Sequence, residues 1–527
     1  MSLRSAGRLV LVAALVVGAG AAVPGGPAAG AGSTVDVTFG SQGRTVVPTG
    51  AAASVRDLAV QPDGRVVGVG YVLNGSINRS GGLLNEVDAL VFRLRTDGSL
   101  DPTFGIRRLD LGAAEEAEGV AIQPDGRIVV VGSTGIGDDA VAWRLLPSGE
   151  PDPEFGVNGV RTIDSGGVEH AADVAIAPDG KVVVVGGTTV GGGEMVVYRL
   201  RTTGEPDPTF DGDGALGFGG AGSDFAFAVL VQRDGKVVVT GRDAEATGPS
   251  VVRLTATGEP DPTYGVGGVV TLPAAADTAT ALVRAPGDGV YVATQTRDGT
   301  DWDAVVHRVT ASGAIDPAWG NGAGARIPET GGDESVYDLA VLPTGGVAAS
   351  GETSVGEDAL VGAFTAAGRP DTAFSSTGVR VIADGLRAVS AMAVQTDGKV
   401  VVGSDDGASE HRPVVLRLIG TYRPRPTCAG KRATIVGTSR SERLIGTPRA
   451  DVIVAGAGND VVRGRGGNDI VCGGTGRDTI DGHAGNDRAY GGDGADVIRG
   501  GDGADLLVGG AGRDLLSGGP GRDVVRQ

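Results

Sequence analysis

Two short motifs, Asp101-Pro102-Thr103-Phe104-Gly105 and Gln123-Pro124-Asp125-Gly126, decide the fold because versions of both recur along most of the chain. The first, here called the aspartate motif, begins at Asp36, Asp101, Asp152, Asp207, Asp261, Asp316 and Asp371. The second, here called the turn motif, follows each aspartate motif once and begins at Gln61, Gln123, Ala177, Gln232, Pro286, Pro343 and Gln395. Such a steady period, of roughly 55 residues, indicates one structural unit copied seven times.

Each unit contains the signals of two β-hairpins. In the turn motif, proline presets one backbone dihedral and glycine accepts a left-handed one, which is the chemistry of a tight hairpin turn. Runs rich in β-branched residues flank this turn, such as Val182 to Val185. Another strand, such as Val141-Ala142-Trp143-Arg144-Leu145, then leads through a glycine-containing turn to the next aspartate motif. Four short strands per unit predict an all-β chain with a seven-bladed β-propeller over residues 33–420.

An open β-solenoid is the alternative arrangement of the same strands. The propeller is favoured because the aspartate motif at Asp36 precedes the first unit, so that an N-terminal strand can complete the last blade and close the ring. The aspartate motifs and Pro-Asp-Gly turns resemble those of the delta-60 repeat family of predicted propeller proteins. That family carries no agreed biochemical activity, so the resemblance implies architecture and little about function.

A charged pattern recurs inside the units. Five arginines stand eight residues before a motif aspartate: Arg93, Arg144, Arg199, Arg253 and Arg308. Four of them have an acid five residues earlier: Asp88, Asp139, Glu194 and Asp303. A carboxylate–guanidinium cluster can clamp a substrate, but a catalytic site breaks the symmetry of a repeat. We therefore predict a scaffold ion pair that ties the outer hairpin of each blade. The first unit also carries extra residues at 74–86, which we interpret as a tolerated insertion.

The C-terminal tract has a different period. Nine aspartates fall at a constant interval of nine residues: Asp451, Asp460, Asp469, Asp478, Asp487, Asp496, Asp505, Asp514 and Asp523. Two residues after each stands a residue suited to a thin core: Ile453, Val462, Val471, Ile480, Ala489, Ile498, Leu507, Leu516 and Val525. Residues 491–499 match the nonapeptide Gly-Gly-x-Gly-x-Asp-x-apolar-x, which is typical of calcium-binding parallel β-rolls.

The nonapeptide suits calcium for physical reasons. Two nonapeptides make one turn of a flattened coil, so residues two nonapeptides apart stack directly. Glycine permits the tight turns, and aspartate supplies the hard oxygen ligands that calcium prefers. Pairing each aspartate with the next but one in the series gives seven sites, from Asp451/Asp469 to Asp505/Asp523, and predicts calcium as the cofactor with all nine aspartates as ligands. A roll whose sites are partly free of metal is the alternative.

Residues 435–527 resemble the RTX, or hemolysin-type, repeats of secreted proteins. This resemblance implies calcium-induced folding in the extracellular medium. We assign residues 428–527 to the β-roll and residues 421–427, Thr-Tyr-Arg-Pro-Arg-Pro-Thr, to a stiff proline-rich linker.

The N-terminus predicts export. Arg4 and Arg8 precede the apolar run 9–17, and small residues suited to signal cleavage follow. We assign residues 1–31 to a signal peptide cleaved after Ala31, with Ala21 as the alternative. The apolar run is too short for a membrane anchor, so no span is expected after cleavage and the protein is expected to be extracellular.

The two cysteines, Cys428 and Cys472, predict one disulfide in an exported protein. Two free buried thiols are the alternative.

The sequence narrows the function. A net charge of −19 argues against nucleic-acid binding. The four histidines form no zinc motif, no Gly-x-Ser-x-Gly elbow is present, and we predict no catalytic residue. The favoured hypothesis is a secreted, non-enzymatic calcium-binding protein whose propeller is a scaffold for an extracellular protein or polysaccharide. Alternatives are an extracellular propeller enzyme, a hydrolase or lyase of polysaccharide or peptide, and a small-ligand module. Acids or histidines gathered asymmetrically at the ring centre would favour the enzyme, and a repeat-symmetric channel would favour the scaffold.

Overall fold

The computed structural model describes residues 35–527 except 78–82, 136–138, 191–192, 220–223, 243–247, 274–275, 299–300, 323, 329–331, 355–357, 376, 383–385, 407–410, 419–426 and 438–440. The signal peptide predicted at residues 1–31 therefore lies outside the described residues, as does all of the predicted linker except Thr427. In the part of the chain that is described, no helix is long and apolar enough to span a membrane.

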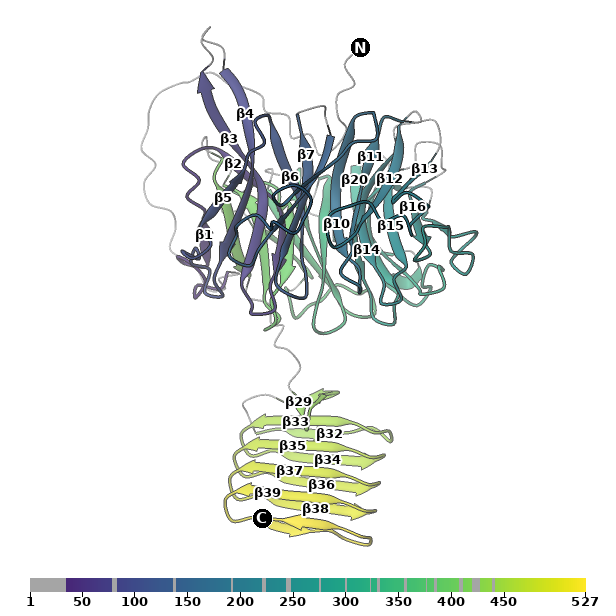
Figure 1. Ribbon diagram of the computed structural model, residues 1–527. Helices are drawn as coiled ribbons and strands as arrows, with labels where there is room; N and C mark the ends of the chain where they lie inside the picture. The colour runs from purple at the N-terminus through teal and green to yellow at the C-terminus, as the bar shows by residue number, and fades with distance from the viewer. Residues whose placement is uncertain are drawn as a thin grey trace. The chain divides into compact units, whose positions relative to one another are not determined.

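The N-terminal part is a ring of seven four-stranded antiparallel sheets, which confirms the predicted seven-bladed β-propeller (Figure 1). Blade 1 consists of β2 (Ala53–Val60), β3 (Val66–Ile77), β4 (Leu83–Leu94) and β5 (Ile106–Leu109). Blade 2 consists of β6 (Glu115–Ile122), β7 (Ile128–Thr134), β8 (Asp139–Leu145) and β9 (Val160–Ile163). Blade 3 consists of β10 (Glu169–Ile176), β11 (Val182–Thr188), β12 (Glu194–Leu200) and β13 (Ala215–Phe218). Blade 4 consists of β14 (Phe225–Val231), β15 (Val237–Arg242), β16 (Ser250–Leu254) and β17 (Val269–Thr271). Blade 5 consists of β18 (Ala276–Arg284), β19 (Val290–Asp298), β20 (Asp301–Val309) and β21 (Ala325–Arg326), and the short η2 (Gly320–Gly322) precedes β21. Blade 6 consists of β22 (Glu334–Val341), β23 (Val347–Thr353), β24 (Asp358–Phe364) and β25 (Val379–Ile382). The first strand of each blade packs against the first strand of the next, so these strands form the inner ring.

The ring closes with strands from both ends of the propeller. Blade 7 contains β26 (Ala391–Val394), β27 (Val400–Asp405) and β28 (Pro413–Leu418), and its outer strand is β1 (Arg44–Val46) from the N-terminal end. β1 pairs antiparallel with β28, with Thr45 opposite Val415. The predicted closure by an N-terminal strand is therefore confirmed, and a closed ring leaves only short, protected sheet edges.

The aspartate motifs lie in the turns between the third and fourth strands of the blades, and the predicted ion pairs form there. Arg93 Nε donates to Asp101 Oδ2 over 2.9 Å, and the pairs that begin at Arg144, Arg199, Arg253 and Arg308 span 2.7 to 2.8 Å. A second contact goes beyond the prediction. Arg93 Nη1 donates to the Pro147 carbonyl of the next blade over 2.6 Å, so the arginine joins neighbouring blades as well as its own hairpin.

Ring closure uses the same side chains. Arg417 Nε donates to Asp36 Oδ2 over 2.9 Å, although the two residues are 381 positions apart, and Arg417 Nη1 donates to the Thr96 carbonyl over 2.7 Å. Asp36 and Arg417 are both buried. Burial by itself raises the pKa of Asp36, but hydrogen bonds from Thr38 and Lys399 and the positive charge of Arg417 outweigh it and hold that pKa well below its usual range.

In blade 2, the aromatic residue of the aspartate motif, Phe155, packs against the arginine that pairs with this motif and against the next blade. The Arg144 guanidinium lies 4.7 Å from the centre of the Phe155 ring. Gly204, in a turn of the next blade, has a φ of +85°, and a Cβ there would lie 2.9 Å from the Gly156 nitrogen and 3.1 Å from the Phe155 ring. Glycine in this turn is therefore required both by its backbone conformation and by the close approach of the neighbouring aspartate motif.

The extra residues of the first unit form regular structure at their base. β3 and β4 continue past the length of the other blades, and their paired residues extend to Ile77 opposite Leu83. The hairpin projects beyond its neighbours in Figure 1. The insertion thus lengthens a two-stranded ribbon on both sides of residues 78–82.

The C-terminal part is a parallel β-roll of two facing sheets, as predicted (Figure 1). One sheet contains β31 (Ile435–Val436), β33 (Val452–Ala457), β35 (Ile470–Thr475), β37 (Arg488–Asp493), β39 (Leu506–Ala511) and β41 (Val524–Arg526). The other contains β32 (Arg443–Ile445), β34 (Val461–Gly466), β36 (Thr479–Ala484), β38 (Val497–Asp502) and β40 (Leu515–Ser517). Paired residues stand two nonapeptides apart, such as Ile480 opposite Ile498, which confirms two nonapeptides per turn.

The roll has a thin apolar interior made of the predicted residues. Seven of the nine are at most 2% exposed: Ile453, Val462, Val471, Ile480, Ala489, Ile498 and Leu507. Leu516 is partly buried, and Val525 in the last strand is 48% exposed. The repeat therefore buries its apolar position where a further coil lies on each side.

The predicted disulfide between Cys428 and Cys472 is present. Cys428 lies in β29 (Thr427–Cys428), which forms a two-stranded hairpin with β30 (Lys431–Arg432). Cys472 lies in β35, so the bond joins this small hairpin to the first complete coils of the roll.

Replacing the ring-closing arginine tests the role of the buried ion pair. We expect Arg417→Met to lower the free energy of unfolding of the propeller by about 3 kcal/mol, because the buried carboxylate of Asp36 is left without its guanidinium. Denaturant unfolding followed by tryptophan fluorescence reports the propeller alone, since Trp143, Trp302 and Trp319 all lie in it. The control Arg161→Met breaks a pair with the exposed Glu205 and should cost less than about 1 kcal/mol. Equal effects of the two substitutions would contradict this role.

Candidate metal centre of the β-roll

The nine periodic aspartates form two columns along the roll. Each aspartate directly precedes a strand, so that alternate residues of the series precede strands of opposite sheets. Six of these side chains belong to residues at most 2% exposed: Asp460, Asp469, Asp478, Asp487, Asp496 and Asp505. A column of buried carboxylates is costly without positive charge, because burial and mutual repulsion both oppose ionisation.

The structure brings together the two members of each of the seven predicted pairs. The backbone N–H of the first aspartate donates to Oδ1 of the second, over 2.8 to 3.1 Å, in the pairs 451/469, 460/478, 469/487, 478/496, 487/505, 496/514 and 505/523. One carboxylate oxygen of each pair is therefore committed to holding adjacent coils in register. The other carboxylate oxygen, Oδ2, takes no part in this contact.

That other oxygen is a buried acceptor without a hydrogen-bond donor among the described residues. This holds for Oδ2 of the acceptor aspartate in six of the seven pairs, and Oδ2 of Asp460 shares the property; the seven atoms are Oδ2 of Asp460, Asp469, Asp478, Asp487, Asp496, Asp505 and Asp514. Buried carboxylate oxygens are nearly always satisfied in native proteins, so a row of seven open ones points to a cation.

Asp451 and Asp523, at the two ends of the series, differ from the rest. Asp451 Oδ2 accepts hydrogen bonds from both the backbone N–H and the hydroxyl of Thr447, and its Oδ1 accepts one from Thr434. Burial raises the pKa of Asp451, but these hydrogen bonds lower it more. Asp523, near the C-terminal end of the roll, is only partly buried.

Glycine backbone surrounds the open oxygens. A Cβ built on Gly491 would lie 2.4 Å from Asp496 Oδ2 and 2.5 Å from the carbonyl oxygen of Gly509, and the corresponding distances at Gly473 and Gly482 are 2.4 to 2.5 Å. A carboxylate oxygen and a backbone carbonyl oxygen thus converge over each of these glycines. Oxygens of these two kinds are the usual ligands of calcium. The residues present therefore fit a hard divalent cation.

The electrostatic state of the columns agrees with this fit. Burial, together with the charges of Asp487 and Asp451, raises the pKa of Asp469 to about 6. The pKa values of Asp478, Asp487, Asp496 and Asp505 are raised as well, first by burial and then by neighbouring acids. A bound cation would remove this penalty by pairing with the ionised form.

Two families match the chain, one in each part. The RTX calcium-binding nonapeptide repeat matches residues 436–471, 473–498 and 490–525. The β-propeller domain of unknown function DUF5122 matches residues 61–104, 123–155, 177–210 and 232–264. The chain carries DUF5122 propeller repeats and RTX calcium-binding repeats. The resemblances drawn from the aspartate motifs and the nonapeptides are thereby confirmed, and RTX repeats imply calcium in a structural role.

Comparison with solved structures finds matches of low sequence identity. Hydrazine synthase of Kuenenia stuttgartiensis is 15% identical, with a TM-score of 0.44 over 69% of this chain and 95% of that one. Drosophila semaphorin 2a is 9% identical, with a TM-score of 0.41 over 70% of this chain and 74% of that one. At these values the likeness carries no conclusion about function. No curated protein matches the chain.

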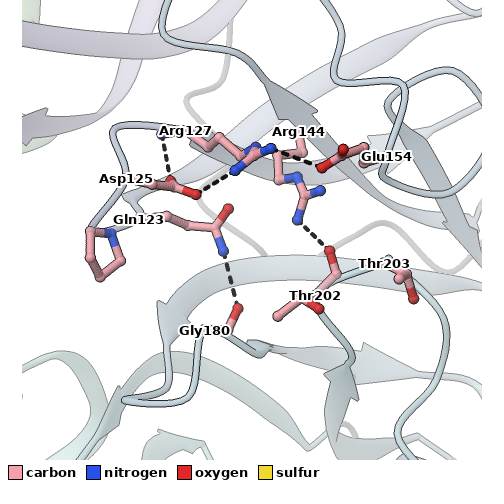
Figure 2. Close-up of a pocket in the computed structure, with 9 residues that line it drawn as sticks. Gln123, Asp125, Arg127, Arg144, Glu154, Gly180, Thr202 and Thr203 are labelled. Carbon is pink, nitrogen blue, oxygen red and sulfur yellow. Dashed lines mark hydrogen bonds and ion pairs between the residues drawn. The ribbon is translucent and has the colours of Figure 1, made fainter.

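A shallow pocket of about 450 Å³ lies at one junction of the DUF5122 propeller. Figure 2 shows that its polar groups are already engaged: Arg144 reaches the Thr202 carbonyl, and Gln123 donates to the Gly180 carbonyl over 3.0 Å. The same contacts recur elsewhere, for instance from Gln395 to the Gly64 carbonyl. This pocket is part of the repeated blade-to-blade scaffold, which includes the arginine–aspartate pair predicted from the charged pattern.

The inner ring is less regular than the junctions. Arg56 on β2 lies 3.7 Å from Glu118 on β6, and its guanidinium lies 5.1 Å from the centre of the Tyr71 ring. On blade 4 the corresponding side is aromatic, with the Phe225 and Phe227 rings 5.0 Å apart. The repeat pattern of the sequence did not single out these residues, because they depart from it instead of following it.

His307 is a packing residue in the interior of blade 5. It is 1% exposed, its Nε2 lies 3.1 Å from Thr294 Oγ1, and burial lowers its pKa to about 4. At neutral pH it is therefore an uncharged residue of the blade interior.

The raised pKa values predict a pH dependence that calcium removes. An unfolded aspartate has a pKa near 3.9, so folding favours the protonated form. In chelator, the roll should be most stable below about pH 4 and lose stability up to about pH 6 as the columns ionise. Circular dichroism of the full chain should show more β-structure in chelator at about pH 5 than at about pH 7.5, and no such difference in calcium. A roll whose β-structure in chelator is unchanged or lost on acidification would contradict the expectation.

Two acids of one nonapeptide allow the effect of a buried column aspartate on calcium binding to be distinguished from the effect of surface charge. Asp496 is buried with an open Oδ2, whereas Asp493, three residues earlier, is exposed. We expect Asp496→Asn to weaken the calcium dependence of roll folding at least about tenfold, since calcium affinity follows ligand charge. Asp493→Asn, which removes the same charge, should leave the calcium midpoint unchanged. Calcium titration followed by circular dichroism measures both, and equal shifts would rule out a special role for Asp496.

Proposed function

We propose that this chain is a secreted calcium-binding protein without enzymatic activity, in which calcium stabilises the RTX roll and the propeller is an interaction scaffold. One observation carries the calcium part: seven buried Oδ2 atoms without donors among the described residues, stacked along the roll. The proposed ligands are the nine periodic aspartates. Asp451 is the weakest member, since both its oxygens already accept hydrogen bonds.

The role of each residue type in the roll follows from its position. Oδ1 holds the next coil in register, Oδ2 faces the glycine backbone, and the glycine leaves room where a Cβ would collide. Bound calcium supplies positive charge between carboxylates that repel one another. Metal binding and folding are then one event, as in other small domains that form their sites only when folded.

The disulfide supports the proposal that the chain is exported. The chain contains a disulfide, and disulfides persist mainly in oxidising compartments. Extracellular modules bind calcium in the 10⁻⁴ to about 10⁻³ M range, which suits a roll that folds only after leaving the cell. We place the signal peptide at residues 1–31 and the mature protein in the extracellular medium.

The propeller supports a scaffold role through its symmetry. Its buried arginines pair with the motif aspartates of their own blades. In the pocket of Figure 2 such an arginine also donates to a backbone carbonyl of the next blade, so it holds the ring together. We infer that its partner is an extracellular protein or polysaccharide that binds across several blades. The net charge of −19 argues against a nucleic acid.

A propeller enzyme acting on polysaccharide or peptide is the second candidate, and the irregular inner ring favours it. Burial raises the pKa of Glu116, and the nearby charge of Glu118 raises it further. Acid groups with raised pKa values beside an arginine occur in hydrolase and lyase sites. Assays of the secreted protein on polysaccharides and peptides decide this point: turnover that is lost in Glu116→Gln but kept in Glu154→Gln, an exposed acid, would replace the scaffold proposal.

Chelation of the full chain tests the calcium proposal. We expect residues 446–527 to lose β-structure when calcium is removed, whereas the propeller stays folded. Circular dichroism follows the roll, and tryptophan fluorescence follows the propeller, because the roll contains no tryptophan. Re-addition of calcium should restore the circular dichroism signal. Retention of the roll's β-structure in chelator at neutral pH would refute calcium-dependent folding.

A further inference from the structure

The junction between blades 2 and 3 contains three carboxylates that belong neither to the ion pairs of the aspartate motifs nor to the roll. Asp139 begins β8, Asp164 follows the end of β9, and Glu169 begins β10 of the next blade. One oxygen from each lies within 4.8 Å of the other two. Two calcium–oxygen bonds of about 2.4 Å end to end span about 4.8 Å, so all three oxygens fit one calcium coordination sphere.

Glu169 provides the second observation. Its side chain is fully buried, and Oε1 accepts hydrogen bonds from the Ser165 hydroxyl, the Gly167 N–H at 3.2 Å and the Thr188 hydroxyl at 3.1 Å. Oε2 is buried as well and accepts none from the described residues. A carboxylate held by three donors on one oxygen and by none on the other is oriented for a cation.

The loop between β9 and β10 is preorganised around this group. Asp164 Oδ1 accepts the N–H of Gly166 over 2.7 Å, which fixes a turn at the start of the loop. Asp164 is exposed, Asp139 half-buried and Glu169 buried, so the cluster opens to solvent on one side. An ion can enter from that side and retain water there as further ligands.

Two other junctions show how the propeller neutralises the corresponding acids elsewhere. Asp88, Asp110 and Glu115 form an equivalent cluster between blades 1 and 2, and there Arg108 Nη1 lies 3.3 Å from Asp88 Oδ2. Between blades 5 and 6, Arg326 lies 3.0 Å from Asp303. In both places the chain itself supplies a cation.

The strand register identifies the corresponding residue at the junction of blades 2 and 3. Arg108 stands opposite Leu90, two residues after Asp88, and Arg326 stands opposite Val305, two residues after Asp303. The residue opposite Val141, two residues after Asp139, is Thr162. Threonine brings no charge to the position that arginine holds in the other two junctions.

We propose that Asp139, Asp164 and Glu169 bind a calcium ion that joins blades 2 and 3 of the propeller, in place of the arginine found at equivalent junctions. This site is separate from the RTX roll. Three carboxylates favour Ca²⁺ over Mg²⁺, because Mg²⁺ is usually held by only one or two carboxylates and keeps several waters. The ion would link the end of one blade to the inner strand of the next.

Terbium luminescence excited through tryptophan tests the site in the full chain. Trp143 lies on β8 with Asp139, and the roll has no tryptophan, so only ions in the propeller are sensitised. We expect sensitised emission that calcium displaces. Thr162→Arg should weaken binding at least about tenfold by supplying the internal cation, and Glu169→Gln should do the same by removing a charged ligand. Thr162→Met, which adds bulk without charge, should bind as the wild type does.

Two further measurements guard against indirect effects. Asp487→Asn, in the roll, should leave the tryptophan-sensitised signal unchanged, which separates this proposal from the roll proposal. Calcium should raise the midpoint of thermal unfolding of the wild-type propeller, followed by tryptophan fluorescence, and not that of Thr162→Arg. The proposal is overturned if the wild type shows no sensitised emission, if Thr162→Arg and Glu169→Gln both bind normally, or if Thr162→Met loses binding as Thr162→Arg does.

Discussion

The propeller depends on a buried arginine that bonds in two directions. In each of several blades this arginine holds the motif aspartate of its own outer hairpin and a backbone carbonyl of the following blade, as Arg253 does with Asp261 and the Ala311 carbonyl. A buried guanidinium without partners would be strongly destabilising, so its presence fixes both the hairpin and the spacing of the neighbouring blade. Blade 6 has Ala363 at this position, and there Arg380 from the fourth strand lies 4.3 Å from the centre of the Phe374 ring.

The two parts of the chain handle carboxylates in different ways. In the propeller, motif aspartates pair with arginines and lysines, and the pKa values of Asp101, Asp152 and Asp261 are held low. Hydrogen bonds and basic neighbours bring the pKa of Asp207 down to about 2 against the effect of burial. In the roll, the stacked acids raise one another's pKa values, and no lysine or arginine pairs with a column aspartate among the described residues. A cation from the medium would neutralise them in their ionised form, in keeping with the RTX calcium-binding repeats of this part of the chain.

The junction between blades 2 and 3 belongs to the propeller, but its acids resemble those of the roll because they suit a cation from the medium. Its acids occupy the positions that are paired with arginine at other junctions, but threonine stands where that arginine would be. Threonine in place of arginine thus leaves a cluster that fits calcium, on a scaffold that brings acids from adjacent blades together. Calcium would then act in both parts of the protein and in the same sense, by joining neighbouring repeats.

The sequence by itself determined whatever repeats. Seven aspartate motifs fixed the number of blades, the motif at Asp36 fixed the closure of the ring, and the nine-residue interval fixed which aspartates stack, because residues one period apart must occupy equivalent places. The two cysteines allowed a single pairing, and the structure decided between that disulfide and two free thiols. Tertiary structure alone decided the contacts that join different repeats. It showed that Arg93 also bonds the Pro147 carbonyl, that Asp451 has no open oxygen, and that Asp139, Asp164 and Glu169 meet. The last three residues come from different parts of two blades, and no periodicity in the chain records a distance that only the packing of one blade on the next creates.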